Sequence, residues 1–94
     1  MPPKAAFSVR HNPDQSRFEI QIDSQTAVLL YKLNAGIILF TSTQVPPELE
    51  GRGIGAALAK AGLEFAQANN LKVQTTCWFV SGYLERHPEY QSLQ

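Results

Sequence analysis

Hydrophobic and polar residues alternate through the first half of the chain, as they do in strands that bury one face. Residues 17–23, Arg-Phe-Glu-Ile-Gln-Ile-Asp, show the strictest alternation. Further strands are predicted at 27–31 and 37–43, each preceded by a short polar turn, and a short strand ending at Val9 is expected after a loose terminus at 1–6. The β-branched, apolar run at 37–43 is expected to be buried on both faces. These strands predict an antiparallel meander.

The second half of the chain changes to helical spacing. Pro46 and Pro47 end the preceding strand because neither can donate to a sheet ladder. A helix ending near Asn69 is then predicted from apolar residues spaced four, three and four apart. These residues are Ile54, Leu58, Ala61 and Phe65.

The chain closes with a predicted strand and a predicted helix. Residues 71–76 alternate again, and apolar residues between 79 and 84 indicate a short helix that Pro88 ends. A helix that joins the fourth strand to the fifth implies that these two strands are parallel. We therefore expect an α+β fold of order ββββαβα, with a mostly antiparallel sheet, in a single domain spanning residues 1–94.

Three glycines on alternate positions, Gly51, Gly53 and Gly55, stand between the fourth strand and the first helix. Glycine has no Cβ, so the backbone N–H groups there can approach a ligand closely. The start of a helix also favours negative charge. The turn is not a Walker loop, since no Gly-Lys-Ser/Thr follows, and hairpins before it do not suit a dinucleotide-binding unit. The pattern predicts either a cradle for the phosphates of another ligand or a tight turn.

Composition narrows the classes of partner. The chain has 94 residues, and its eight basic and eight acidic side chains cancel. Without a basic cluster, no nucleic acid or anionic membrane is expected as a partner. The single cysteine and the absence of a long apolar segment favour a cytoplasmic protein. A monomer is the default expectation.

Two motifs resemble the GNAT acyltransferase family. The run 45–49, Val-Pro-Pro-Glu-Leu, followed by 51–55, Gly-Arg-Gly-Ile-Gly, looks like the acetyl-coenzyme A loop of that family. The runs 77–80, Cys-Trp-Phe-Val, and 86–90, Arg-His-Pro-Glu-Tyr, are similar to its very small members. The resemblance extends from 18 to 90. It implies a GNAT-like fold and an N-acetyltransferase that moves acetyl from acetyl-CoA to an amine, without a metal.

The resemblance also implies a set of cofactor-binding residues. The pyrophosphate would lie on the amides of 51–56, and the pantetheine arm between the strands that end at Val45 and Thr76. An amide near Val45 would polarise the thioester carbonyl. Phe79 is either a wall of the pantetheine channel or a core residue, and Arg86 either contacts phosphates or complements the end of its helix. The whole set is Val45, Gly51, Arg52, Gly53, Ile54, Gly55, Ala56, Phe79 and Arg86.

This chain departs from the family pattern at three positions. Glu50 stands where Gln or Arg is usual, and we expect its carboxylate to point outward and to weaken affinity for a pyrophosphate. Residues 42–44 are Ser-Thr-Gln where the small relatives tend to have His-Thr-Glu, and Gln44 cannot act as a base. The usual acid–base route is therefore missing.

Cys77 and His87 remain as candidate catalytic residues. Cys77 follows a strand and opens a helix, where the helix dipole lowers a thiol pKa, so it is either a nucleophile or a small buried residue. His87 is either a general base or a cation that complements a helix C-terminus. His11 is expected to lie in a polar turn without a specific role.

Three functions stay open on these grounds. The first is acetyl transfer to an amine, such as a polyamine, a protein lysine or a protein N-terminus. The second is a coenzyme A-binding module without turnover, motivated by the missing His and Glu. The third is a structural or partner-binding domain in which the glycines form only a turn.

Overall fold

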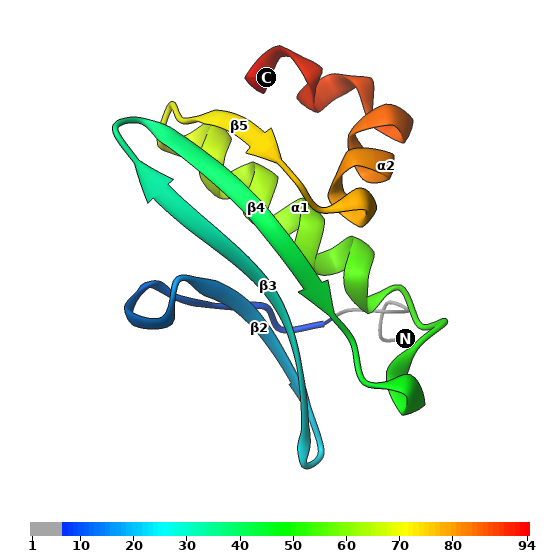
Figure 1. Cartoon of the computed structure of the whole chain (residues 1–94). Coiled ribbons are helices and arrows are strands. Elements are labelled where there is room, and N and C mark those ends of the chain that lie inside the picture. Colours follow the sequence, from blue (N-terminus) through cyan, green and yellow to red (C-terminus); the bar gives the residue numbers. More distant parts are fainter. Residues whose placement is uncertain (1–6) are drawn as a thin grey trace.

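The computed structural model describes residues 7–94, which form a sheet flanked by helices (Figure 1). The strands are β1 (Arg10–Asn12), β2 (Arg17–Ile22), β3 (Gln25–Asn34), β4 (Ile37–Gln44) and β5 (Lys72–Thr75). The α-helices are α1 (Ile54–Ala68) and α2 (Trp78–Arg86), and single stretches of 3-10 helix occupy Pro13–Gln15, Pro47–Leu49 and Pro88–Leu93. Within this described range, no helix is long and apolar enough to cross a membrane.

The sheet follows the chain in the order β1-β2-β3-β4-β5. Its first three pairings are antiparallel, and β4 pairs with β5 in parallel through the crossover that α1 provides. This is the mostly antiparallel α+β fold that the sequence predicts. The predicted strands at 17–23, 37–43 and 71–76 match β2, β4 and β5 closely, whereas β3 extends beyond the predicted 27–31 at both ends.

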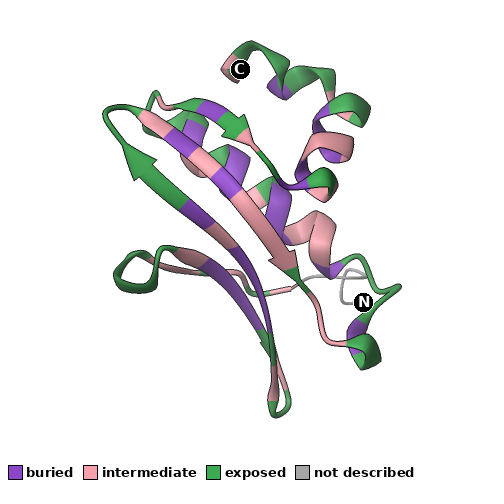
Figure 2. Ribbon diagram, in the orientation of Figure 1, coloured by how far each residue is buried: buried purple, intermediate pink, exposed green. Residues whose placement is uncertain are grey.

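The core lies between α1 and one face of the sheet. Leu58 and Leu63 on α1 and Phe40 on β4 are completely buried there. A Cβ on Gly62 would stand 2.8 Å from the Phe40 ring, so glycine at this position allows the helix to approach the sheet closely. The apolar spacing that predicts this helix therefore identifies the face that packs (Figure 2).

The expectation that β4 is buried on both faces is wrong. Ile38 and Phe40 face α1 and are fully buried, but Ile37 and Leu39, which alternate with them, are only partly buried (Figure 2). Successive side chains of a strand point to opposite faces, and α1 covers only one of them.

The first strand also differs from its prediction. The terminus at 1–6 lies outside the described residues, and the strand occupies Arg10–Asn12 instead of ending at Val9. His11 therefore lies in β1, not in a polar turn. Its ring stacks on Phe18 at 4.3 Å between centroids, and its Nε2 lies 2.7 Å from the Tyr31 hydroxyl. The polar composition of β1 hides this packing from a hydrophobicity pattern.

Candidate functional site

The two parallel strands separate halfway along β4. Their pairing ends where Phe40 lies beside Thr75, whereas β4 continues to Gln44 along β3 (Figure 1). The second half of β4 thus has a backbone edge that β5 does not cover. A wedge between two diverging strands offers peptide groups to an extended ligand.

A turn with left-handed glycines connects this wedge to α1. Gly51 and Gly53 have φ angles of 82° and 79°, and a Cβ at either position would meet no atom within 4 Å. Glycine is therefore required by backbone conformation and not by crowding. The first helical amide bonded to a backbone carbonyl is that of Ala57, which donates to the Gly53 oxygen at 3.0 Å. The preceding N–H groups of Ile54, Gly55 and Ala56 are the orphan donors of the helix start.

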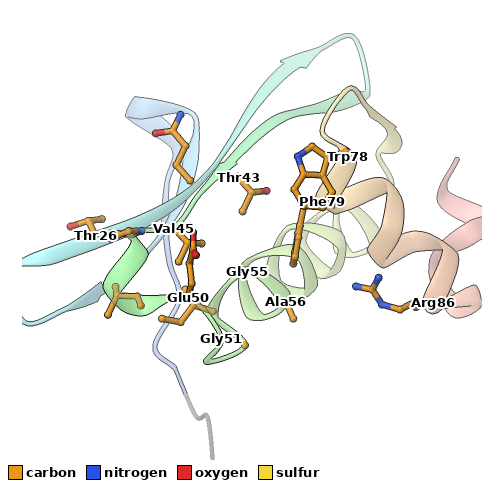
Figure 3. Close-up of a pocket in the computed structure, with 15 residues that line it drawn as sticks. Thr26, Thr43, Val45, Glu50, Gly51, Gly55, Ala56, Trp78, Phe79 and Arg86 are labelled. Atoms are coloured by element: carbon orange, nitrogen blue, oxygen red, sulfur yellow. The ribbon is translucent and has the colours of Figure 1, made fainter.

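An open cleft of about 970 Å³ lies between the end of β4, this turn and the first turn of α2 (Figure 3). Its size is in the range of small-molecule sites. The lining residues are Thr26, Thr43, Gln44, Val45, Pro46, Leu49, Glu50, Gly51, Gly53, Ile54, Gly55, Ala56, Trp78, Phe79 and Arg86. The orphan amides at the start of α1 thus adjoin a cavity.

Helix α2 supplies the opposite wall. Phe79 projects from its first turn toward the start of α1, and Arg86 at its last residue faces the same end of the cleft (Figure 3). Trp78 is 83% exposed and lies edge-to-face with Phe79 at 6.0 Å between ring centroids. This wall therefore carries two aromatic rings at the start of α2 and one cationic group at its end.

A β-bulge brings Thr43 into the cleft. Leu30 pairs with Ser42 while Tyr31 pairs with Phe40, so the ladder skips Thr41. In a regular ladder without this bulge, Thr43 and Phe40 are three residues apart and would point to opposite faces. Because of the bulge, Thr43 stands opposite the buried Leu29, on the face that α1 covers.

Cys77 lies behind Thr43 and does not line the cleft. Its side chain is buried, and its Sγ is 3.3 Å from the Thr43 Oγ1. Burial raises the pKa of the Cys77 thiol, but hydrogen bonds from the Thr43 hydroxyl and from the amides of Val80 and Phe79 outweigh it, so the net pKa lies below the ordinary value. The thiolate is thus stabilised by neutral donors.

His87 lies away from the cleft. It follows the end of α2, where its ring stacks on Tyr83 at 4.0 Å between centroids and its Nδ1 is 3.2 Å from the Glu89 carboxylate. The partners of the His87 ring are thus Tyr83 on α2 and Glu89 just after it, and not a lining residue of the cleft.

The structure brings most of the predicted cofactor-binding residues together. All of them line the cleft except Arg52, whereas the two predicted catalytic residues, Cys77 and His87, do not. Glu50, which was expected to point outward, is one of the lining residues. Among the described residues that line the cleft, Glu50 and Arg86 are the ionisable ones. Sequence reasoning missed Thr43 because its orientation depends on the bulge. Within residues 7–94, no group of three or more His, Cys, Asp and Glu side chains is placed to hold a metal.

Comparison with known proteins identifies the family to which the chain belongs. The family described as GCN5-related N-acetyl-transferase matches residues 17–93. The chain belongs to this family. The GNAT assignment covers the sheet from β2 onward, the glycine turn and both α-helices.

Individual relatives agree with the GNAT assignment. The chain is similar to Protein NATD1 of Homo sapiens, with 35% identity over 92% of this chain and 79% of the relative, and to Protein NATD1 of Xenopus tropicalis, with 32% identity over 100% of this chain and 89% of the relative. It also resembles a Staphylococcus aureus protein described as GCN5-like, solved by NMR. That similarity has a TM-score of 0.73 and 31% identity, and covers 93% of this chain and 86% of the other.

Proposed function

We propose that this protein binds acetyl-CoA in the cleft and transfers its acetyl group to an amine. The observation that carries the proposal is the position of the orphan amides at 54–56, which adjoin a cleft large enough for a small-molecule ligand. Their orientation suits the pyrophosphate, and the uncovered edge of β4 near Val45 suits the pantetheine arm. Family membership supports the choice of coenzyme A over other phosphate-bearing ligands.

We assign each part of the cofactor to different residues of the cleft. Amides of the glycine turn hold the pyrophosphate, and Arg86 adds a positive charge to the phosphate end. Phe79 covers the apolar part of the arm. Glu50 opposes the phosphates at a solvated position, so affinity is moderate. The acceptor is an amine on a small molecule or on a protein.

A non-catalytic coenzyme A-binding module is the second candidate. This candidate is favoured because the cleft has few side chains that could act as a general acid or base. Among the described residues that line the cleft there is no histidine, and Glu50 is the one carboxylate. Transfer activity separates the two candidates, whereas binding alone does not.

Two measurements test the proposal in order. Acetyl-CoA at a concentration one hundred times its dissociation constant should stabilise the fold by about 2.7 kcal/mol, seen as a rise in Tm. Release of free coenzyme A is then followed across a panel of polyamines, lysine peptides and peptide N-termini. Release above the rate of hydrolysis supports the transferase. No thermal shift at millimolar acetyl-CoA excludes both candidates, and a shift without release leaves the binding module.

Three sequence expectations concern the state of the protein in the cell. A monomer, a single domain over 1–94 and a cytoplasmic location stay predictions. Light scattering after size-exclusion chromatography and microscopy of a tagged chain test the first and the last.

A further inference from the structure

The Thr43 hydroxyl connects the cleft to a sulfur that the cleft does not reach. Thr43 lines the cavity, and its Oγ1 lies 3.3 Å from the Sγ of Cys77. Cys77 itself is only 5% exposed and is not among the lining residues. The Thr43 hydroxyl is therefore placed to pass a proton between a group in the cleft and the Cys77 sulfur.

The same geometry opposes a direct attack by Cys77 on a thioester. A nucleophile must come to about 3–3.5 Å from the carbonyl carbon. The Cys77 sulfur is almost completely buried and does not line the cleft, whereas Thr43, which the bulge turns to the same face, does. Proton transfer has no such requirement, because a hydroxyl accepts one hydrogen bond while it donates another.

Cys77 is held in place by its neighbours on β5 and α2. The Thr75 Oγ1 accepts a hydrogen bond from the Cys77 amide at 2.9 Å and donates to the Cys77 carbonyl at 3.1 Å or to the Phe40 carbonyl at 3.2 Å. Burial raises the pKa of the thiol, and hydrogen bonds lower it. The hydrogen-bonding groups are the hydroxyl and amide of Thr43 and the amides of Val80 and Phe79, and none of them carries a charge. A thiolate in this site has donors on several sides and can take up a proton.

We propose that the Thr43 hydroxyl relays a proton from the acceptor amine to the sulfur of Cys77 during the acetyl transfer proposed above, on which this inference rests. The amine nitrogen forms a bond to the thioester carbon, giving an N-protonated tetrahedral adduct. That N–H proton passes to the Thr43 oxygen as the hydroxyl proton passes to the Cys77 thiolate. The adduct then expels coenzyme A as a thiolate, which recovers the proton from Cys77 through the same hydroxyl. The products are an amide and coenzyme A, and the thiol is never acylated.

The test compares kcat, KM and the thiol pKa in variants of the full chain. Thr43→Val and Cys77→Ala should each lower kcat by about 10²-fold, the low end of general-base effects, and leave KM for acetyl-CoA unchanged. The double variant should be no slower than either single variant, because one pathway is interrupted. Thr43→Ser should recover most of the loss. Ser42→Ala, which removes the neighbouring β4 hydroxyl that does not line the cleft and accepts a hydrogen bond only from the Gln44 side chain, is the matched control and should keep the wild-type kcat.

A second readout does not depend on turnover. The ultraviolet absorbance of the thiolate, followed against pH, should show a higher Cys77 pKa in Thr43→Val and a wild-type pKa in Thr43→Ser. If Thr43→Val does not fold, Thr43→Ala provides the same comparison.

Several results would overturn the relay. A wild-type kcat in Thr43→Val would exclude the proton relay and would leave the proposed transferase function unaffected. An acetyl group on Cys77 that forms and is discharged during turnover, detected by intact mass, replaces the relay with a covalent route. Acetyl-CoA binding without transfer to any amine removes the proposed transferase together with the relay.

Discussion

The ring of Phe79 occupies the space that a side chain at position 55 would need. A Cβ on Gly55 would lie 2.8 Å from the Phe79 Cζ, closer than real contacts of this kind. The start of α2 is thereby packed against the start of α1, and both line the cleft. The third glycine of the turn, unlike the first two, is required by this contact and not by a left-handed backbone.

Gly55→Ala tests whether this contact shapes the cleft. We expect the methyl group to push the Phe79 ring toward the ligand and to weaken coenzyme A binding about tenfold, or about 1.4 kcal/mol. The unfolding free energy should change by less than about 1 kcal/mol, because a helical alanine offsets part of the crowding. Isothermal titration calorimetry and urea unfolding measure the two effects.

A double variant provides the control for that prediction. In a Phe79→Ala background the ring is absent, so Gly55→Ala should have little further effect on affinity. Equal losses in both backgrounds would show that Phe79 does not mediate the effect of Gly55.

Gly53→Ala should lose both stability and affinity. Its φ of 79° is costly for alanine, by about 1–2 kcal/mol, and relaxation of the turn moves the amides that we assign to the pyrophosphate. Gly36, in the turn between β3 and β4, has a φ of 81° and equally open surroundings, but lies at the other end of β4. Gly36→Ala should cost similar stability and leave the Kd for coenzyme A unchanged. An equal loss of affinity in both variants would refute the assigned role of the turn.

Gly62 and Gly82 make a pair that tests the packing of the core. A Cβ on Gly62 would stand 2.8 Å from Phe40 and 3.1 Å from Leu29, both fully buried, so Gly62→Ala should destabilise the fold by about 1–3 kcal/mol. A Cβ on Gly82 would meet only the tip of Arg86, at 3.4 Å. Gly82→Ala should therefore stabilise the fold by about 0.5–1 kcal/mol. Urea unfolding should give shifts of opposite sign, and a stabilising Gly62→Ala would contradict the close approach of α1.

His11 should make stability depend on pH. Burial lowers the pKa of its imidazole below the ordinary value of about 6.5, so the unfolded chain binds more protons than the folded chain in that range. The contribution of His11 to the unfolding free energy should therefore be constant above about pH 7 and fall as the pH drops through about 6.5 toward the folded-state pKa. Urea unfolding between about pH 7 and pH 5 measures this.

The control for that prediction is His11→Phe, which keeps an aromatic ring beside Phe18 without a titrating group. Its decline over the same pH range should be smaller. The pKa of Glu19 is lowered by its hydrogen bonds with Arg17 and Asn12, and its contribution is lost only below its ordinary range, outside this window. An unchanged slope in His11→Phe would assign the decline to other groups.

Periodicity predicts the elements whose burial is regular. The alternation at 17–23 and the four-three-four spacing from Ile54 give β2 and α1 because each buries one face against the other. By contrast, β1 is Arg-His-Asn and has no apolar alternation, so its pairing depends on β2 and on the stacking of His11 over Phe18. Tertiary contact, not local pattern, forms that strand.

The candidate site likewise has parts that the local sequence predicts and parts that depend on tertiary contact. The left-handed glycines and the residues of the turn are local features, so the sequence predicts the floor of the cleft. The orientation of Thr43 depends on which residue of β4 the ladder skips, and that register is set by β3. The burial of Cys77 depends in turn on Thr43 and α2. These relationships join distant segments, and no spacing within one segment encodes them.

Titration of the isotope-labelled chain with coenzyme A, followed by amide ¹H–¹⁵N NMR spectra, tests the central claim most directly. The account predicts that the amides of Gly51 through Ala56 move most, with those of Ile54, Gly55 and Ala56 shifting as donors to the pyrophosphate, while the Gly36 amide stays in place. If these amides keep their positions at millimolar coenzyme A, or if the shifts lie elsewhere, the glycine turn does not bind the cofactor.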